Sequence, residues 1–301
     1  SAWIAIDGQV YDVTAFSKIH PGGVDNILLA AGRECTSLFA SYHPLWVWNS
    51  YKSKLQDYHI GELVAQKGDN VLAHNTNITE FYIGMKKIVE QYFKKTKLNP
   101  RVSNDMKFRI PFIIAMMLTT HYLSMHVIEN FWLGLFVALW SGWSSALLCL
   151  TGVHEASHSA LTGTPYIWKL VGALTHGFLN GANFHVWQNQ HIVGHHLLTN
   201  VHDADPDIDG DGLFRFSPHQ PWYSSHSLQF LTAPMAYGLL STRTRLRDFV
   251  LFFSANRSEV FGPIGFNDGR RMIELALLLS SKVYAFCWVI KLSHSLMVVS
   301  R

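Results

Sequence analysis

Long apolar runs alternate with polar, histidine-rich stretches along the 301 residues of this chain. Two of these runs, residues 110–128 and 131–153, have the length of a helix that spans a bilayer. The Glu129-Asn130 step between them is short enough for a hairpin, so both outer ends are expected on one side of the membrane. Three basic residues precede the hairpin: Arg101, Lys107 and Arg109. The positive-inside rule therefore predicts that this side is cytosolic.

The apolar pattern is weaker in the second half of the chain. Residues 167–184 are broken by glycine and asparagine, which predicts a re-entrant or interfacial helix. Residues 228–240 are apolar but too short to cross, and residues 273–290 form a third apolar run. A second basic stretch, expected on the cytosolic side, contains Arg243, Arg245, Arg247, Arg270 and Arg271. Because the third run has no returning partner before Arg301, and the chain starts at Ser1 without a signal peptide, we expect a fragment of a longer protein.

The first 65 residues have the pattern of a small mixed domain. Residues 3–13 alternate apolar and polar side chains around Asp7-Gly8, which predicts a hairpin that turns at this step. Helical segments follow, and residues 58–62 are expected to form a returning strand. The polar stretch 66–71 is the predicted linker. Residues 81–98 place apolar side chains at helical spacing beside several lysines, which predicts either an amphipathic helix at a membrane surface or a soluble connecting helix.

Charge and cysteine content narrow the classes of function. The formal net charge is only +3, so no nucleic-acid partner is indicated. The three cysteines, Cys35, Cys149 and Cys287, are too widely scattered for a disulfide framework or a thiolate metal site. A reducing, cytosol-facing environment is consistent with this pattern.

Two of the histidine clusters in the chain have helical spacing. His154 and His158 are four residues apart at the end of the second apolar run, and His191 is followed by His195 and His196. Positions i and i+4 share one face of a helix, so each pair can point at a common ligand. Neutral imidazole suits iron, zinc and copper. The two clusters together therefore predict a metal site.

Several neighbouring side chains have more than one interpretation. Glu155, Asp203 and Asp205 can orient imidazole N–H groups, but a capping or solvated-loop role fits them equally well. His176, His185 and His202 lie near the clusters, and a supporting or surface role is favoured over metal ligation. His121 and His126 fall inside the first apolar run and are interpreted as packing residues.

The N-terminal region contains motifs of a known haem module. The segments Val10-Tyr11-Asp12-Val13, His20-Pro21-Gly22-Gly23 and Ser41-Tyr42-His43-Pro44 resemble a cytochrome b5 haem domain. This resemblance implies that His20 and His43 are the two axial ligands of haem b. Two imidazoles leave haem iron no open position, so such a haem carries electrons. Gly22 and Gly23 allow the backbone to approach the macrocycle closely.

The pattern HxxxH, then HxxxHH, after a membrane hairpin resembles the membrane fatty-acid desaturase and hydroxylase superfamily. An N-terminal cytochrome b5 domain is similar to the front-end desaturases, which act between an existing double bond and the carboxyl end. Within that group, residues 190–200, followed by Asp203-Ala204-Asp205-Pro206-Asp207, resemble the Δ5 enzymes most.

The resemblance implies a full set of ligands and partners. Two non-haem irons are expected on five histidines: His154, His158, His191, His195 and His196. Imidazole-rich coordination tolerates the strong oxidant that an unactivated C–H bond requires, whereas thiolates would be oxidised. The implied partners are a polyunsaturated fatty acyl chain linked to coenzyme A or phospholipid, O2, cytochrome b5 reductase and the lipid bilayer. The implied location is the endoplasmic reticulum membrane, with both metal domains facing the cytosol. Four tryptophans are candidates for the walls of an acyl tunnel or for an interfacial belt: Trp140, Trp143, Trp168 and Trp187.

The family's third box, QxxHH, does not occur before Arg301. Five box histidines do not complete the family's two-iron shell, so we expect the 301-residue chain by itself to be inactive and to hold iron weakly. The expected fold class is multi-domain. A small α+β haem domain over residues 1–65 is followed by a linker and amphipathic juxtamembrane helix over 66–107. An all-α, C-terminally incomplete desaturase domain is expected over 108–301.

Three alternatives remain open at this stage. The same ligands can serve a Δ4 or Δ6 acyl desaturase, a Δ8 sphingolipid desaturase or a hydroxylase. A membrane-anchored electron carrier with an inactive desaturase remnant is a second alternative. The third is a zinc hydrolase, because the segment from His154 to His158 matches the HExxH pattern. The fused haem module favours redox chemistry over hydrolysis.

Overall fold

The computed structural model describes residues 1–43, 48–64, 79–102, 104–208, 212–253, 257–258, 262–263 and 268–299. They form two compact units. One contains residues 1–100 with 196–199, and the other contains residues 101–195 with 200–301. The predicted linker at 66–71 lies outside the described residues.

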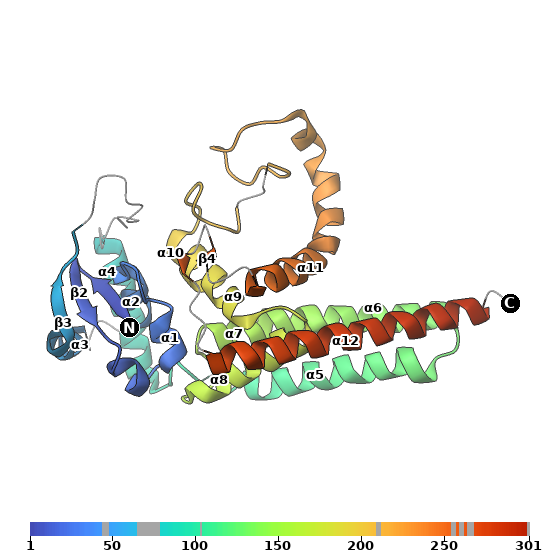
Figure 1. Ribbon diagram of the computed structural model, residues 1–301, viewed down its shortest axis with the longest axis horizontal. Helices are drawn as coiled ribbons and strands as arrows, with labels where there is room; N and C mark the ends of the chain where they lie inside the picture. The colour runs from blue at the N-terminus through green and yellow to red at the C-terminus, as the bar shows by residue number, and fades with distance from the viewer. Residues whose placement is uncertain are drawn as a thin grey trace. The chain divides into compact units, whose positions relative to one another are not determined.

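The first unit is built on a three-stranded antiparallel sheet of β1 (Trp3–Ile6), β2 (Gln9–Asp12) and β3 (His59–Glu62), in that order (Figure 1). Asp7 and Gly8 have φ values of 52° and 74°, as a two-residue type I′ turn requires. The predicted hairpin and returning strand are therefore confirmed. Between β2 and β3, the described residues of this unit form short helices: η1 (Phe16–Ile19), α1 (Val24–Leu28), α2 (Thr36–Tyr42), α3 (Trp48–Leu55) and η3 (Gln56–Tyr58).

The predicted amphipathic helix is present as α4 (Glu80–Thr96). It begins where the Thr79 hydroxyl accepts a hydrogen bond from the Tyr82 backbone N–H at 3.2 Å, and it ends at Lys97, whose φ of 56° is left-handed. Its apolar side chains are not buried in the first unit. Its two predicted roles, at a membrane surface or as a soluble connector, therefore stay predictions.

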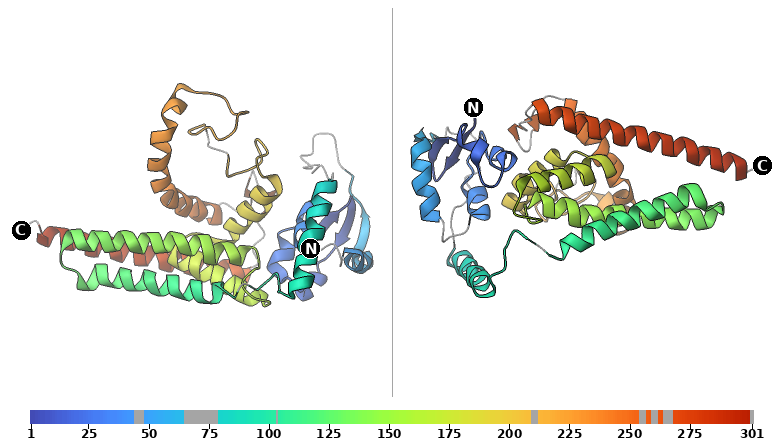
Figure 2. Two further views of the ribbon diagram at one scale, coloured as in Figure 1. Left: turned by 180° about the vertical axis from the view of Figure 1, so that it is seen from behind. Right: turned by 90° about the horizontal axis from the view of Figure 1, so that it is seen from below.

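The second unit begins with the predicted pair of long apolar helices (Figures 1 and 2). α5 (Met106–Tyr122) continues into the π-helix η4 (Leu123–Val127), and α6 (Phe131–Leu148) continues through the π-helix η5 (Cys149–Val153) into α7 (His154–Ser157). The Asn130 side chain caps α6 by accepting a hydrogen bond from the Leu133 N–H at 3.0 Å. The spans Met106–Val127 and Phe131–Ser157 are long and apolar enough to cross a membrane, and only 11% of each apolar window is buried. Such exposure is typical of lipid-facing helices and not of soluble core helices.

The segment after α7 is a series of short helices rather than the single helix predicted for 167–184. It contains α8 (Pro165–Gly172), the π-helix η6 (Ala173–Leu179), α9 (Phe184–Gln188), the π-helix η7 (Asn189–His195) and α10 (His196–Leu198). Gly181, with a φ of 66°, turns the chain between η6 and α9. Side chains of this segment pack with α5 and α6 into one apolar core around Met117, Leu148, Trp168 and Phe184.

Two longer helices complete the second unit. α11 (Gln229–Phe253) follows η8 (Ser224–Leu228). The apolar run 228–240 forms its first half, so the helix is longer than the run that predicted it. The short strands β4 (Arg257–Ser258) and β5 (Gly262–Pro263) pair with each other before α12 (Asp268–Val299). α12 contains the third apolar run, and its Tyr284 hydroxyl is hydrogen-bonded to His121 at the end of α5. The predicted fold class, a small α+β domain followed by a helical domain, is confirmed. Among its described residues, the second domain departs from all-α only in the pair β4 and β5, which have two residues each.

Close packing at Gly172 generates a prediction for stability. A Cβ atom there would overlap the ring of Phe184, which is 1% exposed. Gly172→Ala is therefore expected to lower the free energy of unfolding by about 1–3 kcal/mol, although alanine favours a helix. The measurement is thermal unfolding of the detergent-solubilised protein. Gly142→Ala on α6, where a Cβ meets nothing within 4 Å, is the matched control and is expected to leave the melting temperature unchanged or raised.

Candidate metal centres

Four histidines converge in the second half of the chain. The ring nitrogens available as ligands in His154, His158, His191 and His196 all lie within 4.8 Å of one another. His158 Nε2 and His191 Nε2 lie 3.2 Å apart. Ring centroids are 4.6 Å apart for His154 and His158, and 5.0 Å for His154 and His191. The structure thus brings the two predicted clusters together.

The local winding of the chain explains which histidines meet. His154 and His158 lie one turn apart, and the His158 N–H donates to the His154 carbonyl at 3.1 Å. His191 lies in η7, a π-helix, in which hydrogen bonds join residues i and i+5. The predicted i, i+4 pair stays together, because the ring centroids of His191 and His195 are 5.9 Å apart with an interplanar angle of 21°. The four-histidine group also includes His196, which the spacing of His191 and His195 does not predict.

His195 faces a different environment. Its Nδ1 lies 3.0 Å from Asp205 Oδ1 and 3.5 Å from Asp207 Oδ2. Asp205 is 1% exposed and also accepts hydrogen bonds from the backbone N–H groups of Asn200 and Asp207, at 2.8 and 2.9 Å. Burial raises the pKa of Asp205, but these donors and His195 outweigh it, so the pKa lies below its usual value. The predicted orienting role of Asp205 thus has a direct contact to support it.

The other residues singled out from the sequence have separate positions. Glu155 Oε1 lies 3.5 Å from His154 Nδ1, whereas Asp203 contacts His202 at 2.9 Å and not a clustered histidine. His185 is buried, and neither it nor His202 belongs to a metal-competent group among the described residues.

Trp187 and His176 form a layer behind the four-histidine group. The Trp187 ring stacks on His191 with centroids 4.8 Å apart and an interplanar angle of 15°. The ring centroid of His176 lies 5.8 Å from that of Trp187. His176 is buried, and neither of its ring nitrogens has a hydrogen-bond partner among the described residues. Trp187 thus packs directly on a clustered histidine.

Two charged residues of the site were missed in the sequence. Arg247 on α11 donates to Oε1 of the Gln190 side chain at 2.8 Å, and Nε2 of the same amide donates to Asp207 at 3.3 Å. The sequence placed Arg247 in a basic stretch at a membrane face, and nothing local to α11 indicates its contact with the segment that bears His191. The DxDPD tail contains Asp207, but its spacing alone does not single that residue out.

The four-histidine group fits a first-row transition metal. Two imidazole nitrogens bound side by side to one ion, with bonds of about 2.1 Å, lie roughly 3 Å apart. The 3.2 Å between His158 Nε2 and His191 Nε2 matches that spacing. The ligand set is nitrogen only, which suits iron, copper or zinc and not a hard ion such as magnesium.

The first unit contains a second pair of histidines. His20 Nδ1 lies 3.0 Å from the Gly23 carbonyl oxygen, and His43 Nδ1 lies 2.8 Å from the Phe39 carbonyl oxygen. Each Nδ1–H therefore donates to the backbone, and Nε2 carries the lone pair that can bind a metal. The ring centroids are 6.4 Å apart. Two imidazoles on opposite sides of one iron, with bonds of about 2 Å, need roughly this separation, so the pair fits a haem with two axial histidines.

Both glycines of the HPGG motif are required by the backbone around His20. A Cβ at Gly22 would lie 2.7 Å from His20 Cε1, so a larger residue would push the imidazole aside. Gly23 has a φ of 86°, a conformation that side chains disfavour, and its carbonyl holds His20. The predicted close approach of the backbone at Gly22 is thus an approach to the His20 imidazole, in addition to any approach to a macrocycle.

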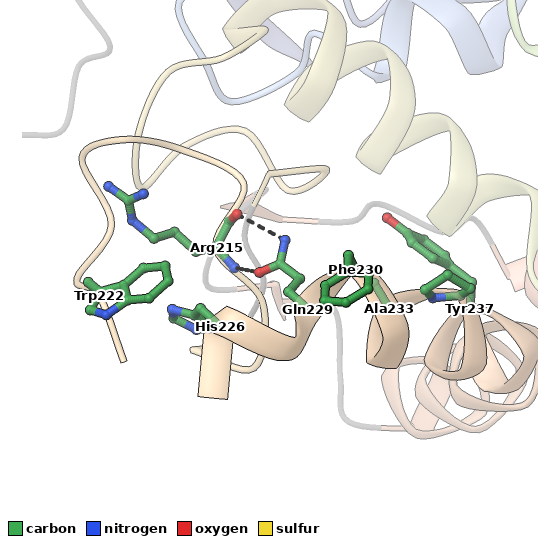
Figure 3. A pocket seen from close by; sticks show the side chains of 8 residues that line it. Arg215, Trp222, His226, Gln229, Phe230, Ala233 and Tyr237 are labelled. Carbon is green, nitrogen blue, oxygen red and sulfur yellow. Dashed lines mark hydrogen bonds between the residues drawn. The ribbon is translucent and has the colours of Figure 1, made fainter. Parts of the chain in front are cut away.

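A separate pocket of about 460 Å³ is formed by η8, the start of α11 and the loop before them (Figure 3). The side chains of Gln229 and His226 are already hydrogen-bonded to nearby backbone groups. Gln229 accepts from the Arg215 N–H at 2.7 Å and donates to the Arg215 carbonyl at 3.1 Å, and His226 accepts from the Tyr223 N–H at 3.1 Å. None of its lining residues belongs to either histidine group, so we assign it no part in metal chemistry.

Comparisons with known proteins agree with these two centres. A family described as "Cytochrome b5-like Heme/Steroid binding domain" matches residues 1–64, and one described as "Fatty acid desaturase" matches residues 130–300. The chain is 39% identical over 254 residues to "Probable Delta(5) fatty acid desaturase C" of Dictyostelium discoideum, which covers 83% of this chain and 54% of that protein. It is 37% identical over 257 residues to an "Acyl-lipid (8-3)-desaturase" of Mortierella alpina, and this match covers 83% of the chain and 56% of that relative. The chain thus spans about half the length of the curated relatives it matches. No solved structure matches it.

The contact between Gly22 and His20 generates a prediction for haem binding. Gly22→Ala is expected to weaken haem binding roughly 2- to 10-fold, because a side chain forced off its rotamer costs about 0.5–1.5 kcal/mol. The measurement is titration of the haem-free protein with haem, followed at the Soret band. Gly84→Ala on α4, where a Cβ meets nothing within 4 Å, serves as control. Unchanged affinity in Gly22→Ala would contradict the close approach.

The burial of His176 generates a prediction for pH dependence. Burial, followed by the positive charges of Arg245 and Arg247, lowers the pKa of His176 from 6.5 to about 4. Between these values the unfolded chain binds a proton that the folded chain does not. The free energy of unfolding is therefore expected to fall as the pH drops from 7 to 4, by up to about 3 kcal/mol from this group.

His176→Leu is expected to flatten this part of the pH dependence, measured as melting temperature against pH. His219→Leu, at an exposed histidine, is the matched control and is expected to keep the wild-type slope. A wild-type slope in His176→Leu would show that His176 is not the buried neutral group.

Proposed function

The chain belongs to the fatty acid desaturase family, and we propose that its protein introduces a front-end double bond, at Δ5, into polyunsaturated fatty acyl chains. The observation that carries this proposal is the convergence of His154, His158, His191 and His196 within 4.8 Å. His154 lies in the last turn of the span Phe131–Ser157, which is long enough to cross a membrane, and His158 directly follows that span. A redox centre at that position is within reach of a lipid chain.

In this proposal the five box histidines, His154, His158, His191, His195 and His196, hold two non-haem irons. When bound, the irons supply the oxidant derived from O2 that an unactivated C–H bond requires. The histidines provide nitrogen ligands that withstand it. Asp205 receives the Nδ1–H of His195 at 3.0 Å, so Nε2 is the ligand atom. Trp187, stacked on His191, restricts the rotation of that imidazole.

The first unit acts as the electron donor. His20 and His43 hold haem b, which supplies single electrons when bound. Held by these two imidazoles, the haem would carry electrons and would not compete for O2. Covalent fusion keeps the donor at a high effective concentration near the acceptor. We infer that cytochrome b5 reductase reduces this domain and that both metal domains face the cytosol at the endoplasmic reticulum membrane.

Regioselectivity is inferred from the relatives. The chain matches proteins named as Delta(5) and acyl-lipid (8-3) desaturases at 35–39% identity, against 28% for those named as acyl-lipid (7-3) desaturases. The words "acyl-lipid" in the names of relatives favour a lipid-linked acyl chain over a coenzyme A ester. The Δ4, Δ6 and Δ8 alternatives use the same ligands, so the product decides among them.

The test expresses the complete reading frame that contains this chain in yeast, fed with C18 and C20 polyunsaturated acids one at a time. Products are located by gas chromatography and mass spectrometry. A new Δ5 bond in C20 substrates is expected, absent in His191→Ala because that variant removes a ligand. In His43→Ala the yield is expected to fall, with residual activity fed by the yeast cytochrome b5. His219→Ala, at an exposed histidine, is the control.

The other outcomes each contradict part of the proposal. A bond at Δ4, Δ6 or Δ8 would overturn the regioselectivity, and a hydroxylated product would overturn the reaction type. A protein that contains haem but yields no product from any substrate would favour the electron-carrier alternative.

A further inference from the structure

We propose that Arg247 on α11 is a positioning residue for the metal centre, because it acts through Gln190 and Asp207 on the imidazole of His195. The inference rests on the proposed function only in taking His195 as an iron ligand. It assigns a role to an arginine that the sequence places in a basic stretch at a membrane face. All four residues belong to the second unit.

The relay is a continuous series of polar contacts. The Arg247 Nη2–H donates to Gln190 Oε1 at 2.8 Å, and the Gln190 amide donates to Asp207 Oδ1 at 3.3 Å. The other oxygen of Asp207 lies 3.5 Å from His195 Nδ1, and the Asp207 backbone N–H donates at 2.9 Å to Asp205, the carboxylate that accepts the Nδ1–H of His195. The Gln190 amide is therefore oriented at both ends, its oxygen toward a cation and its nitrogen toward a carboxylate. A reversed amide would place like groups together at each end.

Arg247 is itself held in place. Its Nε and Nη2 lie 3.3 and 3.2 Å from Asp248 Oδ1, and Asp248 is 1% exposed. The second oxygen of Asp248 accepts the backbone N–H of Asn183 at 2.8 Å. Asn183 caps α9, because its side chain accepts the Val186 N–H at 3.0 Å. Adjacent residues of α11 thus contact both the start of α9 and the histidine-bearing π-helix η7.

A third contact extends this arrangement. Arg245 donates from Nε to the Asn180 carbonyl oxygen at 2.6 Å, in the turn that precedes α9. The segment from Asn180 to Gln190 is therefore bound to α11 at three places. π-helices are rare and occur mostly as single turns at functional sites, so external contacts of this kind are a means of keeping η7 in register. Metal affinity depends strongly on such outer contacts, whose loss typically costs about 10- to 100-fold.

Arg243 provides a matched control, because it lies one turn before Arg247 on the same helix and is exposed. If Arg247 served only as a basic residue at a membrane face, both arginines would make similar contributions. The relay predicts that they differ.

The experiment measures the affinity of the purified protein, expressed from its complete reading frame and stripped of non-haem metal, for Co²⁺. Visible ligand-field absorption of Co²⁺ is recorded as the difference against the same protein before titration. Arg247→Met and Gln190→Met are each expected to weaken Co²⁺ binding by about 10-fold, at the lower end of the range for outer contacts. The double variant is expected to lose no more than either single one, because both act through one series of contacts. Arg243→Met is expected to bind as the wild type does.

Arg247→Lys tests position separately from folding. It keeps one charged donor for Gln190 and is expected to recover part of the affinity lost in Arg247→Met. Wild-type affinity in Arg247→Met, fully additive losses in the double variant, or an equal loss in Arg243→Met would each overturn the proposal. If Arg247→Met fails to fold, the comparison of Gln190→Met with Arg247→Lys still decides, because the relay requires a loss in the first and a smaller loss in the second.

Failure of the proposed function gives a different result. A wild-type protein that binds Co²⁺ but forms no unsaturated product would refute the desaturase proposal, while the comparison of arginine variants would still test the relay. Normal product formation with wild-type Co²⁺ affinity in Arg247→Met would refute the relay alone.

Discussion

The buried carboxylate of Asp205 is the interaction on which the arrangement of the second histidine segment depends. A carboxylate removed from water is costly unless donors surround it. Asp205 has three, the N–H groups of Asn200 and Asp207 and the imidazole of His195. Satisfying it folds the loop after η7 back onto that helix and fixes His195 at the same time. The left-handed backbone of Asn200 and Asp203, with φ values of 62° and 61°, is part of this fold-back.

The winding of η7 determines how the other histidines are shared. An α-helix places His191 and His195 on one face, and this was the prediction from spacing alone. A π-helix widens the turn by one residue, so His196 joins His191 in the group. The ring of His195 stays beside that of His191, and its Nδ1 contacts Asp205. A spacing rule based on 3.6 residues per turn does not anticipate the part of His196.

Features encoded by neighbouring residues could be predicted from the sequence. The Asp7-Gly8 turn follows from backbone preferences, the two long helices follow from run length, and the HPGG and HP motifs mark His20 and His43, the proposed haem ligands. Features that join distant segments were not predictable in this way. Trp187 was assigned to a tunnel wall or interfacial belt, yet its ring stacks on His191. The end of this helical stretch at Leu179, before the turn at Gly181, and the contacts of Arg245 and Arg247 also join or separate segments in ways that local pattern does not indicate.

The two candidate metal centres differ in what holds their imidazoles, and this difference matches their proposed roles. In the first unit both Nδ1–H groups donate to neutral backbone carbonyls, of Gly23 and Phe39. In the second unit His195 donates to a carboxylate, and Glu155 lies beside His154. An anionic partner makes imidazole a more basic ligand and stabilises a metal in a higher oxidation state. Neutral partners suit a centre that only exchanges single electrons, whereas carboxylate partners suit one that must sustain a strong oxidant. The same side chain can therefore serve both centres, because the acceptor behind each ring sets its electronic character.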